Sequence, residues 1–451
     1  MSLPLYLSQI AAVLGCDKPV VDVEITGTAI DSRKVLLGSL FVAIDGERVN
    51  GHDYIAAARQ AGASAALVSV RQHDPLPQLV VSDVVQAFGI LAKFWRQQCD
   101  AKIVAVTGSN GKTTVKEMIA AILRQCGSVI ATQGNLNNEL GVPLTLTRLN
   151  KSTDYAVIEM GANHRGEISR LVEMAQPQFS IINNVADAHL EGFGDLMGVA
   201  KAKAEIFLGL AEDGVGVFNA DMDFVNEWKQ VLANRKSISF ALDNEADITA
   251  KDLQLDTSSS HFMVELQGEF HYVNVPLPGI HNVANALAAI AITHAMAIPA
   301  QAMVKGLATM AAVPHRLQLR RGFNQSQLID DSYNANPGSY KQALATLVTF
   351  SGEHWLVLGD FGELGSDSEH IHSQMGTDAK KAGIDRLWTV GVQSKNACET
   401  FGNGAQHFDD VATLEAMLRK TITKDVTCLI KGSRFMQLDK LADSLAEEEE
   451  S

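Results

Sequence analysis

Short apolar runs recur along the chain and alternate with segments of helical periodicity. In the middle of the chain these runs are KIVAVTG (102–108), YAVIEMG (155–161), FSIINNV (179–185) and GVGVFNAD (214–221). Such near-continuous runs are typical of a parallel sheet covered by helices on both faces. The helix-compatible stretches VKEMIAAILRQ and HNVANALAAIAITHAMA agree with this. By contrast, the sequence pattern of residues 247–275 is typical of antiparallel hairpins, which we expect to extend the edge of that sheet.

Two further regions repeat a strand and helix pattern. The first contains the strand-like runs LFVAI (40–44) and AALVSV (65–70), with the Ala-rich helical run YIAAARQAG between them. The last region begins a second series with the runs QLIDDSY (327–333), HWLVLGD (354–360), RLWTVG (386–391) and VTCLIKG (426–432). The sequence therefore predicts an α/β protein of three domains: residues 1–82, 83–313 and 314–451. The boundary before the last domain lies in AAVPHR (311–316).

Length and composition agree with several globular domains. The chain has 451 residues, of which 46% are hydrophobic and 20% charged, and its formal net charge is −15. An acidic balance argues against a nucleic-acid groove, which needs clustered Lys and Arg, so no nucleic-acid partner is expected. It does not exclude anionic ligands, because a local nest of backbone N–H groups can bind phosphate within an acidic protein.

The sequence contains no apolar run of membrane-spanning length, and its first residues lack the basic region of a signal peptide. The five cysteines are scattered and none forms a CxxC pair. We therefore expect reduced thiols in a cytoplasmic protein without membrane insertion.

The stretch TGSNGKTT follows the first strand of the middle region and precedes a helix. The literal GxxxxGK[ST] spacing fails because Val106 stands where the first glycine belongs. Two glycines still allow tight turns in which successive N–H groups face one anion, at the positive end of the helix. Lys112 can neutralise phosphates, and the Thr113 hydroxyl can bind Mg²⁺. The order of strand, glycines, Lys and Thr favours nucleotide binding over an ordinary strand-to-helix turn.

Candidate metal ligands follow other strands. Glu159 ends the run YAVIEM, where a carboxylate can bind Mg²⁺ or simply cap the next helix. His189 follows the run FSIINNV, and a structural role is about as probable as a ligand role. Lys201 and Lys203 lie two apart on a helix, so they point to different faces and at least one is solvated. A lysine buried near a metal can lose its proton and react as a neutral amine.

These segments together resemble the Mur ligase family, the ATP-dependent amide ligases of peptidoglycan precursor synthesis. The resemblance covers nearly the whole chain and rests on TGSNGKTT, EMGANHRGEI (159–168), NNVADAHLEGFG (183–194), HNVANALAA (281–289) and DDSYNANP (330–337). It implies a UDP-sugar-binding N-terminal domain, a central ATPase domain and a Rossmann-like C-terminal domain. It also implies ATP as substrate and two Mg²⁺ ions.

The resemblance implies roles for particular residues. The expected ATP contacts are Thr107, Gly108, Ser109, Asn110, Gly111, Lys112, Thr113, Thr114, Asn282, Asn285, Arg316 and Asp331. The expected metal ligands are Thr113, Glu159, His189 and Lys203, the last as a CO2-derived carbamate. Lys112, His189 and Lys203 are the expected catalytic residues, and Ser32, Arg33, Asn137, Asn138, Asn334 and Asn336 the expected substrate contacts. The polar residues of GNLNNELGVP (134–143) could equally cap a turn.

Within the family, EMGANHRGEI, DDSYNANPGS and LGDFGELG are most similar to the branch that uses D-alanyl-D-alanine and UDP-N-acetylmuramoyl-tripeptide. We expect a monomer that joins these two partners through an acyl phosphate. Another amide ligase of the same fold, such as a folylpolyglutamate synthetase, is the main alternative. A nucleotide-binding protein without catalysis is a second alternative, and the retained Lys112, Glu159, His189 and Lys203 argue against it.

Overall fold

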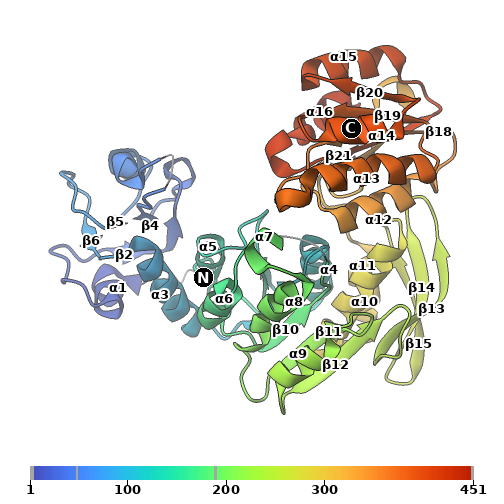
Figure 1. Cartoon of the computed structure of the whole chain (residues 1–451). Coiled ribbons are helices and arrows are strands. Elements are labelled where there is room, and N and C mark those ends of the chain that lie inside the picture. Colours follow the sequence, from blue (N-terminus) through green and yellow to red (C-terminus); the bar gives the residue numbers. More distant parts are fainter. Residues whose placement is uncertain (1–4, 47–48, 187–189, 448–451) are drawn as a thin grey trace.

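The computed structural model describes residues 5–46, 49–186 and 190–447, which form three large sheets with their helices and one short two-stranded sheet (Figure 1). The N-terminal sheet lies at one end of the molecule, and the C-terminal sheet stands above the far side of the middle sheet. None of the helices formed by these residues is long and apolar enough to cross a membrane.

The N-terminal sheet has four parallel strands in the order β3-β4-β5-β6. They are β3 (Gly27–Ala29), β4 (Ser39–Val42), β5 (Ala65–Val68) and β6 (Gln78–Val80). Around them lie α1 (Leu7–Leu14), α2 (Ile55–Gln60), the 3-10 turns η1 (Ser32–Lys34) and η2 (Gly51–Tyr54), and the short pair β1 (Leu5–Tyr6) and β2 (Glu24–Ile25). The helix α3 (Val84–Gln97), capped by the side chain of Asp83, packs against α1 and also against the middle domain.

Nine strands form the middle sheet, in the order β15-β14-β13-β12-β11-β10-β7-β9-β8. They are β7 (Lys102–Thr107), β8 (Val129–Ala131), β9 (Tyr155–Glu159), β10 (Phe179–Ile182), β11 (Val215–Asn219), β12 (Lys236–Ala241), β13 (Ile248–Leu255), β14 (Ser260–Leu266) and β15 (Glu269–Val275). The strands from β8 to β13 pair in parallel, and β13 to β15 form the expected antiparallel extension. After β7 the chain adds β8 and β9 on one side of it and then β10 on the other side. A ligand crevice is therefore expected beyond the carboxyl end of β7.

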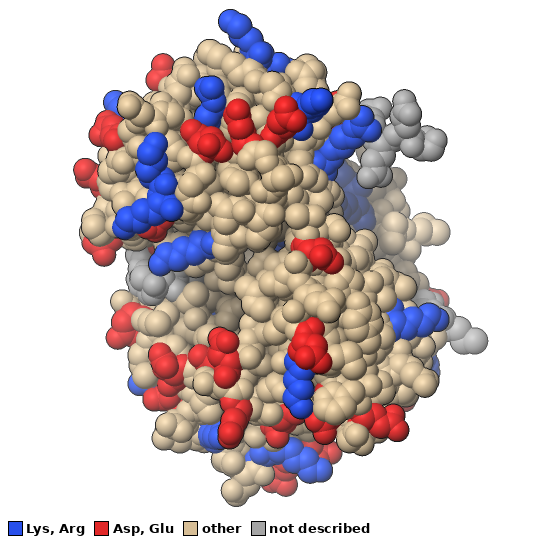
Figure 2. All heavy atoms as spheres, turned by 90° about the vertical axis from the view of Figure 1, so that its right-hand side faces the viewer, with Lys and Arg blue, Asp and Glu red and all other residues tan. Residues whose placement is uncertain are grey.

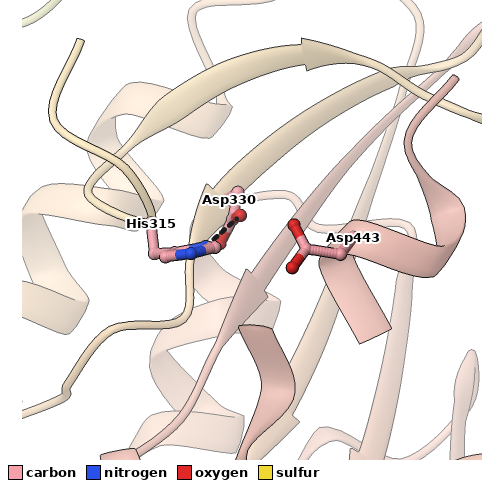
Figure 3. Close-up of side chains that lie close together, drawn as sticks. All are labelled: His315, Asp330 and Asp443. Carbon is pink, nitrogen blue, oxygen red and sulfur yellow. Dashed lines mark hydrogen bonds and ion pairs between the residues drawn. The ribbon is translucent and has the colours of Figure 1, made fainter. Parts of the chain in front are cut away.

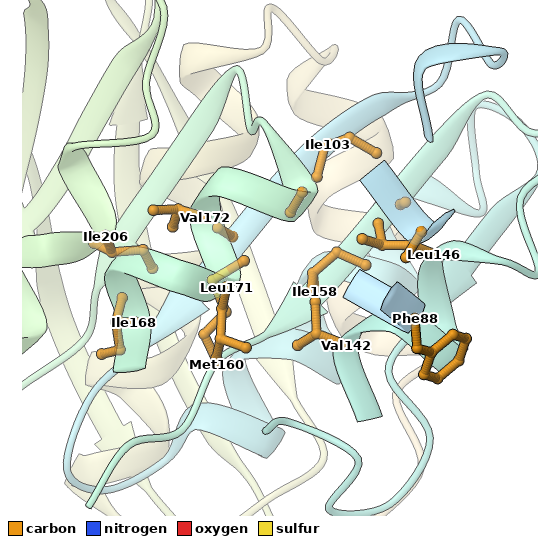
Figure 4. Packing of buried hydrophobic residues seen from close by; sticks show 14 of the residues in the cluster. Phe88, Ile103, Val142, Leu146, Ile158, Met160, Ile168, Leu171, Val172 and Ile206 are labelled. Carbon is orange, nitrogen blue, oxygen red and sulfur yellow. The ribbon is translucent and has the colours of Figure 1, made fainter. Parts of the chain in front are cut away.

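Alternate residues of the middle strands face opposite cores. Val104, Val106 and Val157 face α4 (Lys112–Leu123), α10 (Ile280–Ala295) and α11 (Ala300–Ala308). On the other face, Ile103 and Ile158 pack with side chains of α3, α5 (Gly141–Leu146) and α6 (Glu167–Ala175), as Figure 4 shows. The helices α7 (Leu190–Phe193), α8 (Leu196–Ala204), α9 (Val225–Leu232) and the turn η3 (Glu205–Phe207) complete this side. Each such buried aliphatic side chain contributes roughly 1.5–3 kcal/mol, which fixes β7 and β9 firmly.

The C-terminal sheet has six strands in the order β16-β17-β21-β18-β19-β20. They are β16 (Gln318–Arg321), β17 (Gln327–Asp331), β18 (Glu353–Gly359), β19 (Arg386–Val390), β20 (Ala405–Phe408) and β21 (Val426–Lys431). The helices are α12 (Pro337–Leu347), α13 (Ser368–Lys381), α14 (Ser394–Phe401), α15 (Val411–Thr421) and α16 (Leu438–Leu445), with short turns η4 (Phe323–Gln325), η5 (Gly365–Asp367) and η6 (Arg434–Met436). On the face that carries the C-terminal domain and β13 to β15, acidic and basic side chains are interspersed (Figure 2).

The strands expected from the apolar runs are all present, and eight further strands were not expected: β1, β2, β3, β6, β8, β12, β16 and β20. β8, β12 and β20 have partly exposed residues and no continuous apolar run. β16 reads QLRR and pairs antiparallel with β17, so the second sheet is parallel except at this edge. β8, β16 and β20 lie at sheet edges and are paired on one side only, so they need no apolar run to form, whereas β12 pairs with both β11 and β13.

Candidate active site

Residues 108–111 join β7 to α4 at the carboxyl edge of the middle sheet, and residues 107–114 together are called the phosphate loop. Gly111 immediately precedes α4 with a φ of +72°. A Cβ atom at this position would lie 2.4 Å from Oδ1 of Asn285 and 2.8 Å from Nδ2 of Asn183. Only glycine fits there, and the backbone can then turn so that the N–H groups beginning α4 remain available to an anion.

Lys112 folds back over this loop. Its Nζ donates hydrogen bonds to the carbonyl oxygens of Gly108, at 2.8 Å, and Ser109, at 3.2 Å. Burial lowers the pKa of Lys112, the carboxylate of Glu159 opposes this shift, and the guanidinium of Arg316 adds to it. An anion beside the loop would replace the two carbonyls as the partner of Nζ and relieve the cost of its desolvation.

A network of asparagines holds the loop from below. The side chain of Asn184, just after β10, accepts from the backbone N–H of Asn110 at 2.8 Å and donates to its carbonyl at 3.0 Å. Asn183 donates from Nδ2 to the same carbonyl at 3.0 Å and to Oδ1 of Asn285 at 2.9 Å. Asn285 in turn donates to Asn282 at 3.2 Å. Because Asn282 and Asn285 lie on α10, the network joins the loop rigidly to the wall of the cavity described below.

Glu159 lies at the end of β9 with a side chain that is 2% exposed. Its Oε1 accepts a hydrogen bond from Nδ2 of Asn137 at 2.7 Å, whereas its buried Oε2 has no hydrogen-bond partner. A buried carboxylate oxygen without a partner is costly unless a cation neutralises it. Together with the hydroxyl of Thr113 on the neighbouring loop, this donor set has the oxygen chemistry that suits Mg²⁺.

The two lysines of α8 face different surroundings, as the spacing predicted. Lys201 is exposed, whereas Lys203 is 2% exposed. Burial lowers the pKa of Lys203 well below its ordinary value, and the positive charge of Lys112 lowers it further. The neutral amine that this favours is the form that reacts with CO2. His189 lies outside the described residues, so its expected metal role stays a prediction.

The C-terminal domain reaches the loop through Arg316. Its Nη2 donates to Oγ1 of Thr113 at 3.0 Å, and its guanidinium carbon lies 4.2 Å from the centre of the Tyr333 ring. Asp331 ends β17 and forms an ion pair with Lys431, which ends β21. Burial raises the pKa of Asp331, and the ammonium of Lys431 counteracts part of this rise.

A second contact joins the domains at Asn336. Its Nδ2 donates to Oδ1 of Asn110 at 2.6 Å, while its Oδ1 accepts from the N–H of Ser339 and so caps α12. The phosphate loop, α10, the asparagine network and α12 enclose a cavity of about 450 Å³. Its walls include the predicted ATP residues Ser109, Asn110, Gly111, Lys112, Thr114, Asn282, Asn285, Arg316 and Asp331 and the predicted substrate residues Asn334 and Asn336.

Other predicted residues lie outside this cavity. Ser32 and Arg33 form the turn η1 of the N-terminal domain, where Arg33 is exposed and bonds Asp31. Asn138 accepts from the N–H of Gly141 at 3.0 Å and so caps the start of α5. Its neighbour Asn137 contacts Glu159. Thr107 lies beneath the loop, fully buried, with its hydroxyl bonded to the carbonyl of Met160.

Sequence reasoning did not single out Asn183, Asn184, Tyr333 or Lys431. The two asparagines follow a buried strand directly, which is the same signal that identified Glu159. Lys431 likewise ends the apolar run of β21 and is fully buried. Tyr333 carries no comparable signal, since its contacts with Arg316 and Arg434 come from distant parts of the chain or from the folded linker.

Three family profiles match the chain in succession. They are described as "Mur ligase family, catalytic domain" for residues 24–96, "Mur ligase middle domain" for residues 106–293, and "Mur ligase, glutamate ligase domain" for residues 315–434. The chain is also 45% identical to the UDP-N-acetylmuramoyl-tripeptide–D-alanyl-D-alanine ligase of Escherichia coli, over 98% of each chain.

Solved structures agree with this. A crystal structure of MurF from Acinetobacter baumannii superposes with a TM-score of 0.91 at 33% identity, covering 99% of this chain and 100% of that one. A MurF ligase of Thermotoga maritima, solved in complex with ADP, has a TM-score of 0.81 at 26% identity, covering 93% and 98%. The similarity thus spans all three sheets as well as the sequence. The chain belongs to the Mur ligase family.

Proposed function

We propose that the protein joins D-alanyl-D-alanine to UDP-N-acetylmuramoyl-tripeptide at the expense of ATP, for peptidoglycan synthesis. ADP and phosphate are the other products. The observation that carries the proposal is that Arg316 and Asn336 of the C-terminal domain both contact the phosphate loop. The chain that makes these contacts is similar to ligases that are named for this reaction. Such a cavity can hold the phosphates of ATP against one domain while the other completes the site.

In the first step the terminal carboxylate of the tripeptide attacks the γ-phosphorus of ATP, forming an acyl phosphate while ADP leaves. In the second step the amine of D-alanyl-D-alanine attacks the acyl carbon, and phosphate is expelled with loss of the ammonium proton. Lys112 and Arg316 stabilise charge on the transferring phosphoryl group. The rigid asparagine network under Asn110 keeps the loop in position, so positioning contributes much of the rate.

Mg²⁺ would be held by Thr113 and Glu159, and a second ion by His189 and a carbamate on Lys203. These ions supply charge stabilisation for phosphoryl transfer when they are bound. The unpartnered Oε2 of Glu159 and the lowered pKa of Lys203 support this assignment. The hydrogen bond from Asn137 orients the Glu159 carboxylate toward the same place.

The N-terminal domain would bind the UDP end of the sugar precursor through Ser32 and Arg33. We place the domains at residues 1–82, 83–313 and 314–451, with the linker 311–316 as the hinge. We propose that the protein acts as a monomer. The free cysteines of the chain support action in a reducing compartment such as the cytoplasm.

The alternative is that the protein is another Mur-type or a folylpolyglutamate-type ligase. The phosphate loop alone would bind ATP in any of these enzymes. Phosphate release from ATP should therefore be measured with the tripeptide precursor, with and without D-alanyl-D-alanine. The proposal requires release that depends on both substrates, with the pentapeptide product detected by mass. Release only with folate and glutamate, or with another peptide pair, would refute this substrate assignment.

A further inference from the structure

Four charged or titratable side chains meet beside the linker between the middle and C-terminal domains. His315 comes from the linker, Asp330 from β17, Arg320 from β16 and Asp443 from α16. Figure 3 shows His315, Asp330 and Asp443 converging from these three parts of the fold. One atom from each of these three lies within 4.8 Å of the others, as in a metal site.

The position of Arg320 argues against a metal ion between these side chains. Its Nη1 donates to Oδ2 of Asp330 at 3.1 Å and to Oδ1 of Asp443 at 2.7 Å. The guanidinium thus bridges the two carboxylates where a dication would have to bind, and two cations so close repel each other. The cluster is therefore an ion-pair network.

Asp330 is the centre of this network and is fully buried. Its Oδ2 also bonds Nδ1 of His315 at 2.8 Å, which requires the ring to donate from that nitrogen. Its Oδ1 accepts from the N–H and the hydroxyl of Ser332, at 3.2 and 2.6 Å. Both carboxylate oxygens of the buried Asp330 thus accept hydrogen bonds from several donors, so His315 is tied to a well-satisfied anchor on β17.

The linker next to His315 has an unusual backbone. His315 has a φ of +60° and Leu317 a φ of +45°, and Arg316 lies between them. Such values are costly for residues with a Cβ, so surrounding contacts must maintain them. The carbonyl of His315 accepts from the N–H of Tyr333 at 3.1 Å, and the N–H of Leu317 donates to Asp331 at 3.2 Å. The Arg316 side chain leaves this turn toward Thr113 in the other domain.

We propose that the network of His315, Asp330, Arg320 and Asp443 positions Arg316 for its contact with the phosphate loop. His315 is a positioning residue that acts through its neighbour, because its side chain bonds Asp330 while Arg316 bonds Thr113. The network thereby ties the closed arrangement of the two domains to the packing of α16. The proposal rests on the proposed ATP-dependent function.

A double-mutant cycle between His315→Ala and Arg316→Ala tests this proposal. Arg316→Ala should lower kcat/KM for ATP about a hundredfold, as for loss of a donor to the transition state. His315→Ala alone should lower kcat/KM about tenfold, because a misplaced Arg316 guanidinium stabilises the transition state less. When Arg316→Ala is already present, adding His315→Ala should lower kcat/KM for ATP by less than about twofold. Equal factors in both backgrounds, or no effect of His315→Ala alone, would overturn the proposal.

Matched variants separate positioning from general damage. His315→Asn keeps a donor near Nδ1 and tolerates a positive φ, so it should restore most of the lost activity. His407→Ala removes a histidine that bonds Thr389 at 2.9 Å near the opposite edge of the same sheet, and it should leave kcat/KM unchanged. A loss in His407→Ala equal to that in His315→Ala would contradict a specific role. If His315→Ala does not fold, Asp443→Ala takes its place in the cycle, because it removes the acceptor of the Arg320 hydrogen bond. Its loss of kcat/KM should likewise disappear in the Arg316→Ala background.

ATP affinity, measured by calorimetry on the four proteins of the cycle, distinguishes failure of the proposed function from failure of the positioning proposal. If the wild type binds ATP but forms no pentapeptide, the proposed function fails, and the dissociation constants still test the coupling. If the wild type forms pentapeptide and the two changes are additive in both measurements, the positioning proposal fails alone.

Discussion

Nη2 of Arg316 donates to Oγ1 of Thr113 over 3.0 Å, although the two residues are 203 positions apart. One belongs to the linker of the C-terminal domain and the other to the first turn of α4. The same threonine is a proposed Mg²⁺ ligand, so the contact occupies the place where phosphates and metal would bind. Arg316 is thus poised to exchange a hydroxyl for a phosphate oxygen, which binds a guanidinium more strongly.

Gly111→Ala should abolish tight ATP binding. The substitution adds a Cβ 2.4 Å from Asn285 and strains a φ of +72°. Gly268→Ala is the matched control, because Gly268 has a φ of +83° and open space around the added Cβ. The positive φ should cost both variants about 1 kcal/mol of unfolding free energy, and the clash with Asn285 should cost Gly111→Ala more. Only Gly111→Ala should lose nucleotide affinity by calorimetry. Unchanged affinity in Gly111→Ala would contradict the assigned loop.

Asn336 has two functions that substitution can separate. Asn336→Ser keeps an oxygen that caps α12 but loses the amide donor to Asn110, so Tm should hold while KM for ATP rises about threefold to tenfold. Asn336→Ala should lose both, with a lower Tm. Asn336→Asp keeps the cap and turns a carboxylate oxygen toward Oδ1 of Asn110, so its KM should rise most. A KM in Asn336→Ser equal to the wild type would show that this contact does not support closure.

Glu159→Gln should raise the Mg²⁺ concentration needed for half-maximal turnover, about tenfold or more. The amide can still accept from Asn137, so the fold should survive, but it no longer offers a negative charge to the cation. Glu173→Gln removes a carboxylate that pairs with Lys93 on the surface and serves as the control. Magnesium titrations of phosphate release give the comparison, and an identical requirement in both variants would refute the ligand role.

His281 should make the protein less stable in mild acid. Burial, with a smaller effect of the Lys431 charge, lowers the pKa of His281 from 6.5 to about 4. Between these pH values the unfolded chain takes up a proton that the folded chain does not, so unfolding free energy falls as pH falls through this range. His281→Asn should show a shallower fall in urea midpoint from pH 6.5 to 4 than the wild type.

The histidine at position 370 supplies the control for that experiment. It is exposed on α13, so His370→Asn should follow the wild-type pH dependence. Other acid-sensitive groups are common to all three proteins and cancel in the comparison. A slope in His281→Asn equal to that of the wild type would mean that His281 does not contribute to acid sensitivity.

Local patterns predicted the parts of the site that lie within one strand and its next turn. The order of β7, two glycines, Lys112 and Thr113 identified the phosphate loop, and Glu159 was found because a carboxylate ended an apolar strand. Asn183 and Asn184 gave the same signal after β10, but amides also cap turns, and Asn138 does cap α5. Local chemistry alone could not separate these cases.

Contacts between domains were beyond local patterns. Nothing in the sequence places Arg316 against Thr113, and the resemblance to a known family implied only that each of them contacts ATP. The ion pair of Asp331 with Lys431 joins two strands 100 positions apart. Edge strands such as β16 were missed because their charged residues give no apolar run, although β16 supplies Arg320 to the network at the linker.

The central claim is transfer of a phosphoryl group to the tripeptide carboxylate before the amide forms. It is tested most directly by labelling both oxygens of that carboxylate with ¹⁸O and analysing the phosphate released when D-alanyl-D-alanine is present. The account predicts phosphate that carries one ¹⁸O atom, because the bridging oxygen of the acyl phosphate leaves with phosphorus. Phosphate without label, formed together with pentapeptide, would contradict it.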